Sequence, residues 1–274
     1  METNSTFGAS KPVVGMVHLP PLPGAPRYDP EAGREGLHES ARRDAERLAA
    51  GGVDAVMVEN FGDVPFYPED VPKPVVAEMA SLARTVRESA GLPVGVNVLR
   101  NDGPAAVAVA AASGADFVRV NVHVGARVAD QGILEGRAHE TARLRERIDA
   151  SGVRILADVD VKHSAPLADP GYEAESLAES AERGLADGVV VSGARTGRET
   201  ALADVERAVE RRDDLGLDAP VFVGSGVTAR NVDELLSIAD GVVVGTALKE
   251  GGETTAPVSV GRVEELVAAA DGVR

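Results

Sequence analysis

The residues of this chain that are best suited to chemistry are charged side chains inside a Val-rich run near residue 160. Asp158, Asp160 and Lys162 alternate there with valines. Because the side chains of a strand alternate between its two faces, these three groups are expected to share one face. Two adjacent carboxylates disfavour each other's ionisation and a nearby ammonium favours it, so the cluster could separate an acid from a base.

The same cluster has two other interpretations. Carboxylate and imidazole ligands suit zinc, manganese or magnesium, so Asp158 and Asp160 with His163, or with His18, could hold a divalent metal. This metal is the one cofactor that the sequence suggests. Alternatively, the charges could form a buried network of salt bridges that closes the top of the fold.

Polar side chains also end several other Val-rich runs. They are His18, Glu59, Asn97, Asn121, His123 and Ser192. Burying such a group without a partner costs ~1–3 kcal/mol, so each needs an explanation. Arg119 lies deepest in its run, and we expect it to pair with Asp158. Asn121 and His123 share its face and are expected to lie nearer a substrate.

A second kind of site is indicated by glycine-rich turns near the end of the chain. Gly224-Ser225-Gly226 and Gly245-Thr246 each follow a Val-rich run. Glycines let backbone N–H groups approach an anion, and a helix N-terminus after each turn would add a favourable dipole. Ser192-Gly193 begins a third such loop, which could add another anion contact. The alternative is that these glycines only make tight turns.

Eight short strands are needed to position these groups, and the sequence supplies eight apolar runs of the right length. The predicted strands are Val13–Leu19, Ala55–Asn60, Pro93–Leu99, Phe117–His123, Arg154–Val161, Gly188–Gly193, Pro220–Gly224 and Gly241–Gly245. Amphipathic stretches separate them, beginning with Arg34–Ala50 and ending with Val260–Ala270. Such alternation predicts an α/β fold, a single (β/α)8 TIM barrel of the phosphate-binding type.

The barrel assignment also explains where the polar residues fall. Reactive groups of such barrels lie at the carboxyl ends of the strands, and the loops after strands seven and eight are their commonest phosphate site. An open doubly wound sheet is the alternative, but the first strand runs into the proline-rich loop Pro20–Pro26 instead of a glycine-rich phosphate turn. We expect residues 1–10 to be a disordered tail and residues 11–274 to form one barrel domain.

The composition of the chain limits the kinds of partner that it is expected to bind. The chain has 274 residues, no cysteine and a formal net charge of −16. Such a charge repels nucleic acid, and no apolar stretch is long enough to span a membrane. A cytoplasmic location is therefore expected. The chain could also form a homo-oligomer, because the Pro20–Pro26 loop could dock another subunit. The charge suggests a host with a salty cytoplasm, and the alternative is an ordinary acidic bacterial protein.

Several segments together resemble the BtpA family, which includes the SgcQ-like proteins. They are Lys11–Gly24, Asp54–Asn60, Arg119–His123, Ala157–Ser164, Ser192–Gly197, Gly224–Asn231 and Asp240–Lys249. The resemblance implies a phosphate-binding barrel. The cyanobacterial namesake of that family is associated with photosystem I biogenesis at the thylakoid surface, which would imply peripheral membrane association. The acidic, lysine-poor composition resembles a haloarchaeal member.

The leading functional hypothesis is an enzyme that acts on a small phosphorylated metabolite, a sugar phosphate. Asp160 and Lys162 would move protons, while His18, Glu59 and Asn121 would position hydroxyl groups, as isomerase, epimerase or aldolase-type chemistry requires. The rival hypothesis is a non-catalytic assembly factor with an exposed apolar patch near the Pro20–Pro26 loop. Nucleotide hydrolysis is disfavoured because no Gly-Lys-Ser/Thr phosphate loop occurs.

Overall fold

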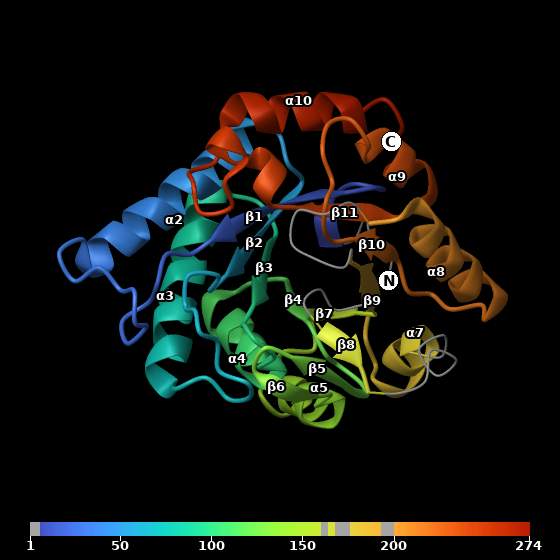
Figure 1. The fold of residues 1–274 in the computed structure, drawn as a ribbon, viewed down its shortest axis with the longest axis horizontal. Helices are drawn as coiled ribbons and strands as arrows, with labels where there is room; N and C mark the ends of the chain where they lie inside the picture. The colour runs from blue at the N-terminus through green and yellow to red at the C-terminus, as the bar shows by residue number, and fades with distance from the viewer. Residues whose placement is uncertain (1–5, 160–163, 168–175, 193–199) are drawn as a thin grey trace.

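The computed structural model describes residues 6–159, 164–167, 176–192 and 200–274. Within these residues, eight parallel strands form a closed barrel in the order β1-β2-β3-β4-β7-β9-β10-β11. The first strand, β1, pairs with the last, β11, so the two ends of the chain's sheet close the ring (Figure 1). The predicted α/β TIM barrel is therefore confirmed. The barrel strands are β1 (Val13–His18), β2 (Ala55–Glu59), β3 (Val94–Asn97), β4 (Phe117–Val120), β7 (Arg154–Asp158), β9 (Gly188–Val191), β10 (Val221–Val223) and β11 (Gly241–Val244).

Each predicted strand is present, and all eight end earlier than the apolar pattern indicates. β4 ends at Val120 because the amide of Val122 donates to Asn101 Oδ1, at 2.7 Å, instead of to a neighbouring strand. β7 ends at Asp158, and the rest of its predicted length runs into residues outside the described ranges. The polar strand ends thus lie in or beside loops, where side chains rather than ladder partners satisfy the backbone.

Helices cover the outside of the barrel. They are α2 (Gly33–Ala50), α3 (Lys73–Ala90), α4 (Gly103–Ser113), α5 (Ala138–Arg147), α7 (Ser176–Ala178) with the π-helical turn η1 (Glu179–Arg183), α8 (Leu202–Asp214), α9 (Val232–Ile238) and α10 (Val260–Ala270). α3 and α4 end at Gly91 and Gly114, whose φ angles of 63° and 77° lie in the left-handed region that favours glycine. None of the helices in the described ranges is both long and apolar enough to cross a membrane.

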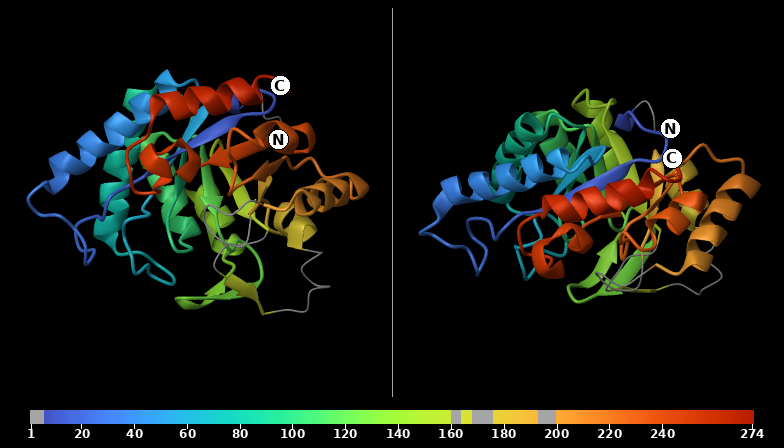
Figure 2. Two further views of the ribbon diagram at one scale, coloured as in Figure 1. Left: turned by 45° about the horizontal axis from the view of Figure 1, so that its top comes forward. Right: turned by 90° about the horizontal axis from the view of Figure 1, so that it is seen from above.

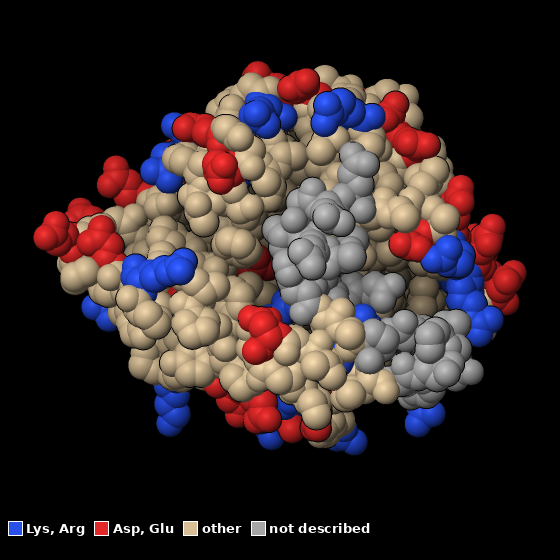
Figure 3. Space-filling view, viewed as in Figure 1, with Lys and Arg blue, Asp and Glu red and all other residues tan. Residues whose placement is uncertain are grey.

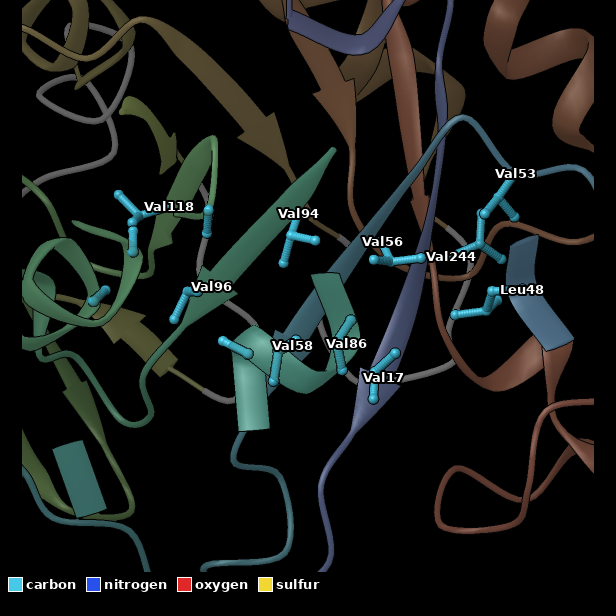
Figure 4. Close-up of a cluster of buried hydrophobic side chains, with 14 of the residues drawn as sticks. Val17, Leu48, Val53, Val56, Val58, Val86, Val94, Val96, Val118 and Val244 are labelled. Atoms are coloured by element: carbon cyan, nitrogen blue, oxygen red, sulfur yellow. The ribbon is translucent and has the colours of Figure 1, made fainter. Parts of the chain in front are cut away.

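The larger part of the core lies between the strands and the helices. Valines dominate it, because every second residue of each strand points outward to the helical layer (Figure 4). On β2, for example, Val56 and Val58 pack outward while Ala55 and Met57 point into the barrel. Branched aliphatic side chains thus fill the space that large aromatic residues fill in other cores.

A second apolar cluster fills the amino-terminal half of the barrel interior. We call it the barrel floor, and its members are Phe7, Val14, Met16, Ala55, Met57, Phe117, Leu156, Val190, Phe222 and Val243. The ring of Phe7 is 3% exposed and lies 5.1 Å from the ring of Phe117 and 5.5 Å from that of Phe222. Residues 6–10 therefore do not match the disordered tail that we expected over residues 1–10. The open end of the barrel needs an apolar cover, and Phe7 provides it.

A small antiparallel sheet was not predicted from the sequence. In the described residues it contains three strands in the order β6-β5-β8: β5 (Ala126–Ala129), β6 (Gly132–Glu135) and β8 (Ser164–Pro166). It stands outside the barrel, on the loops that follow β4 and β7 (Figure 2). The available signal was the two-residue link Asp130-Gln131 between two short runs, which is the length of a tight hairpin.

Candidate functional site

The carboxyl end of the barrel interior carries polar side chains and glycines where the floor carries apolar ones. Each lies two residues beyond a floor or inward position on its strand, so it faces the interior. The register places His18 beside Glu59, Glu59 beside Asn97 and Asn97 beside Arg119. We call this set the mouth layer: His18, Glu59, Asn97, Arg119, Asp158, Ser192, Gly224 and Gly245.

A buried ion pair joins two members of the mouth layer. Arg119 Nε donates to Asp158 Oδ1 at 2.7 Å, and Arg119 Nη2 donates to Asp158 Oδ2 at 2.9 Å and to Ser192 Oγ at 3.2 Å. Burial opposes the charge of Arg119, but the attraction of Asp158, aided by Glu59, outweighs it and raises the pKa of the guanidinium. The predicted pairing of Arg119 with Asp158 is confirmed.

This pairing changes the role expected of Asp158. Both of its carboxylate oxygens are engaged, one by Arg119 alone and the other by Arg119 and by Asn121 Nδ2 at 3.1 Å. A carboxylate held in this way is a poor ligand for a divalent metal, so the metal role predicted for Asp158 does not fit its geometry. No group of three His, Asp or Glu side chains in the described ranges is arranged to hold a metal.

Asparagine side chains extend the network to β3. Asn97 Nδ2 donates to the carbonyl oxygen of Arg119 at 2.7 Å and to Asn121 Oδ1 at 3.2 Å. Asn121, which we expected to position a substrate hydroxyl, therefore links Asn97 to Asp158 through both ends of its amide. The hydrogen bonds of Asn121 thus fix the orientation of Asn97 and Asp158.

His18 and Glu59 form a second pair. His18 Nε2 lies 3.8 Å from Glu59 Oε1, and both side chains are almost fully buried. The imidazole ring also contacts the ring of Phe61, with a centroid distance of 4.9 Å. A Cβ atom at residue 245 would lie 2.9 Å from His18 Cε1, so Gly245 allows the last strand to approach the imidazole closely.

A pocket of about 140 Å³ opens between His18 and the loops that follow β10 and β11. Its lining includes every residue of the two predicted phosphate turns: Gly224, Ser225, Gly226, Gly245 and Thr246. Arg119 and His18 line the same pocket. A Cβ at residue 224 would lie 2.4 Å from Val190 Cγ1 and 3.2 Å from Arg119 Nη2, so only glycine fits there without displacement. The structure thus brings together the two turns that the sequence singled out.

The two loops around the pocket are held differently from what we expected. The turn after β10 is closed by Asn231, whose Nδ2 donates to the carbonyl oxygen of Gly226 at 3.1 Å, and α9 begins only at Val232. Directly after Gly245 comes a single 3-10 turn, η2 (Thr246–Leu248), followed by a second, η3 (Glu250–Gly252). The first amides of such a turn have no acceptor within it. An α-helix N-terminus directly after each turn is therefore not what the structure has.

A buried ion pair fixes the loop after β11 to α2. Lys249 Nζ donates to Asp44 Oδ2 at 2.8 Å, and both side chains are buried. The other oxygen, Asp44 Oδ1, accepts from the amide of Val258 at 3.2 Å. Burial lowers the pKa of Lys249, although Asp44 partly opposes this. The sequence does not indicate this pair, because 205 residues separate the partners.

Four predicted site residues lie outside the described ranges: Asp160, Lys162, His163 and Gly193. Ser192 is described, and it contacts the pocket region through Arg119.

The positions of two further residues, Arg100 and His123, differ from what the sequence predicted for the mouth. Arg100 was not among the predicted site residues, because it lies three residues beyond β3. It is 4% exposed, and burial lowers its pKa despite the nearby charges of Asp158 and Glu59. His123 was expected near a substrate, but its Nε2 lies 2.8 Å from the carbonyl oxygen of Gly184, at the end of η1. His123 is therefore part of the outer packing rather than of the mouth.

Comparison with known proteins places the chain among relatives. The model of the BtpA family matches residues 9–272. An uncharacterized protein of Thermococcus kodakarensis is 47% identical over 264 residues, covering 96% of this chain and 97% of the relative. The photosystem I biogenesis protein BtpA of Synechocystis is 41% identical over 275 residues, covering 100% of this chain and 93% of the relative.

Solved structures share the fold. Thiamine phosphate pyrophosphorylase from Pyrococcus furiosus aligns with a TM-score of 0.57 and 20% identity, covering 96% of each chain. N-(5'-phosphoribosyl)anthranilate isomerase from the same organism aligns with a TM-score of 0.57 and 17% identity, covering 96% of this chain and 100% of the other. At these identities the likeness shows the barrel fold alone.

Proposed function

This chain belongs to the BtpA family, and we propose that it is an enzyme that acts on a small phosphorylated metabolite of the sugar-phosphate type. The observation that carries the proposal is the pocket at the ends of β10 and β11. It collects both glycine-rich turns with the hydroxyl groups of Ser225 and Thr246, and it places His18 and Arg119 on the same walls. Loops after the seventh and eighth strands are the usual phosphate site of such barrels.

The chemistry proposed for the site is proton transfer next to the bound phosphate ester. His18 and Glu59, 3.8 Å apart, would form an acid–base pair beside the pocket. Asp160 and Lys162 are retained from the sequence as further proton-transfer groups. Isomerisation, epimerisation and retro-aldol cleavage each need a proton moved and an oxyanion stabilised, so the proposal covers this class of reactions. The two solved barrels, a thiamine phosphate pyrophosphorylase and an N-(5'-phosphoribosyl)anthranilate isomerase, are named for phosphorylated compounds, which supports the class of ligand.

The binding half of the proposal is tested with inorganic phosphate and ribose 5-phosphate in a calorimeter. We expect the wild-type protein to bind both, and Thr246→Val to weaken both by about tenfold, because one hydrogen bond to a charged oxygen is lost. Ser113→Ala is the matched control: it removes a buried hydroxyl in α4, far from the pocket, that donates to the carbonyl oxygen of Val109 at 2.8 Å. Absence of phosphate binding to the wild-type protein would overturn the proposal.

The catalytic half is tested with a panel of sugar phosphates. Turnover should fall at least about a hundredfold in Glu59→Gln, which cannot take a proton, while phosphate binding is retained. Lys162→Ala tests the role inferred from the sequence. Turnover equal to that of the wild-type protein would remove Lys162 from the mechanism.

A non-catalytic assembly factor is the second candidate, because the Synechocystis relative is named for photosystem I biogenesis. In the Pro20–Pro26 loop, where this candidate expects an apolar patch, Leu22 is fully buried. Exposed Val128 and Ile133 lie instead on the small antiparallel sheet. Under this candidate Ile133→Glu would abolish the cellular function while variants of the mouth layer would leave it intact.

We further propose a cytoplasmic protein adapted to high salt, as a haloarchaeal origin would require. The relatives described above come from Thermococcus and Synechocystis and do not support that origin. The formal net charge of −16 is the remaining argument, and Figure 3 shows acidic side chains interspersed with basic ones around one face. Screening of self-repulsion predicts a melting temperature that rises between 0.1 and 2 M KCl. An unchanged or falling melting temperature would contradict the adaptation.

A further inference from the structure

Asn97 differs from the other buried asparagines of the barrel. The Oδ1 atoms of Asn60 and Asn101 each accept a backbone N–H, from Leu99 and from Val122, both at 2.7 Å. Asn97 is 1% exposed, yet within the described ranges its Oδ1 accepts no hydrogen bond. A buried acceptor without a donor is costly, and in a native protein it requires a reason.

Its neighbours fix the orientation of the Asn97 amide. The carbonyl oxygen of Arg119 can only accept, so the group that lies 2.7 Å from it must be Nδ2. Asn121 presents Oδ1 to Asn97 because its own Nδ2 donates to Asp158 Oδ2 at 3.1 Å. Both carboxylate oxygens of Asp158 accept N–H groups of Arg119, so the atom of Asn121 that faces Asp158 is the donor Nδ2. A flipped Asn97 would place its oxygen against the oxygens of Arg119 and Asn121. The amide is therefore fixed with Nδ2 toward these two residues, and Oδ1 is left as the acceptor without a partner in the described ranges.

The order of the strands relates Asn97 to the pocket, whose lining does not itself include Asn97. Asn97 ends β3, and the ring order places β3 four strands from β10 in either direction. It therefore stands across the barrel from Gly224 and the proposed phosphate site. Its register neighbour on β2 is Glu59, another acceptor when ionised. Two adjacent acceptors opposite an anion pocket are complementary to hydroxyl groups on the far end of a phosphorylated molecule.

We propose that Asn97 is a specificity-determining residue whose Oδ1 accepts a hydrogen bond from a substrate hydroxyl, and that the substrate class is therefore polyhydroxy phosphates. The inference rests on the proposed function for the phosphate anchor. A ligand without the hydroxyl leaves Asn97 Oδ1 buried and unpaired, and sites of this kind reject such analogues strongly. A ligand whose body carries only acceptors or apolar groups is disfavoured for the same reason.

Two phosphate esters with the same carbon chain test the proposal. Ribitol 5-phosphate carries hydroxyl groups along the chain and pentyl phosphate carries none, so the ratio of their dissociation constants isolates the hydroxyl contacts from the phosphate. We expect the wild-type protein to prefer ribitol 5-phosphate by at least about tenfold. Asn97→Leu should reduce this preference about tenfold while the affinity for inorganic phosphate is unchanged. Asn97→Ser is the second variant if the leucine variant does not fold.

Asn101→Leu is the matched control, because it removes a buried asparagine whose hydrogen bonds all go to the backbone of Val122 and Glu135. It should lower stability and keep the preference. Equal affinity of the wild-type protein for the two esters, or a preference kept in Asn97→Leu, overturns the proposal while phosphate binding still supports the proposed function.

If the wild-type protein binds no phosphate ester, the proposed function fails and a crystal soaked in ribitol decides about Asn97. A ribitol hydroxyl within hydrogen-bond distance of Oδ1 supports the assignment. A water molecule alone at that position overturns it.

Discussion

The floor and the mouth of the barrel are built on the same strand faces, one inward position apart. On β4 the inward side chain changes from Phe117 to Arg119, and on β7 it changes from Leu156 to Asp158. On β10 an aromatic ring, Phe222, is followed by a glycine at residue 224. Both layers are buried, but the floor buries apolar surface and the mouth buries charges and amides.

Because of this difference, we expect the floor part of each strand to serve stability and the mouth part to serve ligand binding. Apolar packing in the floor is non-directional and stabilises the barrel whatever the ligand. In the mouth, Arg119, Asp158 and the Nδ2 of Asn97 are held by specific partners, whereas Asn97 Oδ1 has none in the described ranges. A buried polar group left without a partner costs ~1–3 kcal/mol. The hydrogen bonds of the mouth therefore fix the orientation of its side chains more than they add to the free energy of unfolding. Floor substitutions should change unfolding alone, and mouth substitutions should change binding as well.

The largest effect is expected from the buried ion pair of the mouth. Asp158→Leu leaves the Arg119 guanidinium buried without its counter-charge and should lower the free energy of unfolding by about 3–5 kcal/mol. The double variant Arg119→Met/Asp158→Leu removes both charges and should recover most of that loss. Urea unfolding measures both.

Binding distinguishes the ion pair from a purely structural one. Ribitol 5-phosphate should bind neither variant as tightly as the wild-type protein, because the orientation of Asn121 and Asn97 depends on Asp158. A double variant with both wild-type stability and wild-type binding would show that the pair has no role in the mouth, and would break the comparison.

The next effect, in the floor, is expected from Phe7→Ala. Removing a buried phenyl ring that contacts Phe117 and Phe222 should cost about 3 kcal/mol of unfolding free energy. Inorganic phosphate should bind with unchanged affinity, because Phe7 lies at the opposite end of the interior. Phe7→Leu is the control and should cost less. If Phe7→Ala is as stable as the wild-type protein, the contacts of Phe7 with Phe117 and Phe222 do not stabilise the floor.

Two glycines, one in the mouth and one in the floor, allow the two layers to be compared by substitutions that create equally close contacts. A Cβ at residue 224 meets Val190 Cγ1 at 2.4 Å in the mouth, and a Cβ at residue 241 meets Phe222 Cε1 at 2.4 Å in the floor. Gly224→Ala and Gly241→Ala should each cost about 1–3 kcal/mol by overpacking. Phosphate affinity, measured by calorimetry, should fall about tenfold in the first variant and stay unchanged in the second. Equal losses of affinity would mean that the two layers are not separable.

Much of the fold could be predicted because the barrel obeys a simple pattern. Runs such as Ala55–Glu59 are apolar on both faces, which predicts a covered parallel strand, and the eight runs appear in order. The pairing of Arg119 with Asp158 was also predictable, because both lie on inward faces of neighbouring strands, with Asp158 two residues beyond Leu156, the register partner of Arg119. Periodicity carries this information without knowledge of the packing.

What could not be predicted depends on contacts between residues distant in sequence. Phe7 reads as one apolar residue in a polar segment, and its burial depends on the closed ring that leaves space at the floor. The role of Asn97 depends on the directions of three hydrogen bonds that involve Arg119, Asn121 and Asp158. His123 has the same parity as Arg119, yet β4 ends at Val120 and the alternation ends with it.

The smallest effect is expected at His123, which tests where the mouth stops. Burial lowers the pKa of this imidazole below its ordinary value of 6.5, although the hydrogen bond with the carbonyl oxygen of Gly184 opposes the shift, and the charges of Arg145 and Asp187 act in opposite directions. At acid pH the unfolded chain therefore binds a proton that the folded protein resists. The stability linked to His123 is complete above about pH 6.5 and is lost as the pH falls through the lowered pKa, by about 1.4 kcal/mol for each pKa unit of the shift.

His123→Gln keeps a side-chain donor for the carbonyl oxygen of Gly184 but does not titrate. The difference in unfolding free energy between wild-type protein and variant, measured by urea unfolding from pH 8 to pH 5, should be constant above about pH 6.5 and move in favour of the variant below it. Phosphate affinity at pH 8 should be the same in both proteins, since the imidazole packs against the end of η1. A variant with weakened phosphate binding would place His123 back in the mouth, and the boundary would then lie beyond the last paired residue of β4 rather than at it.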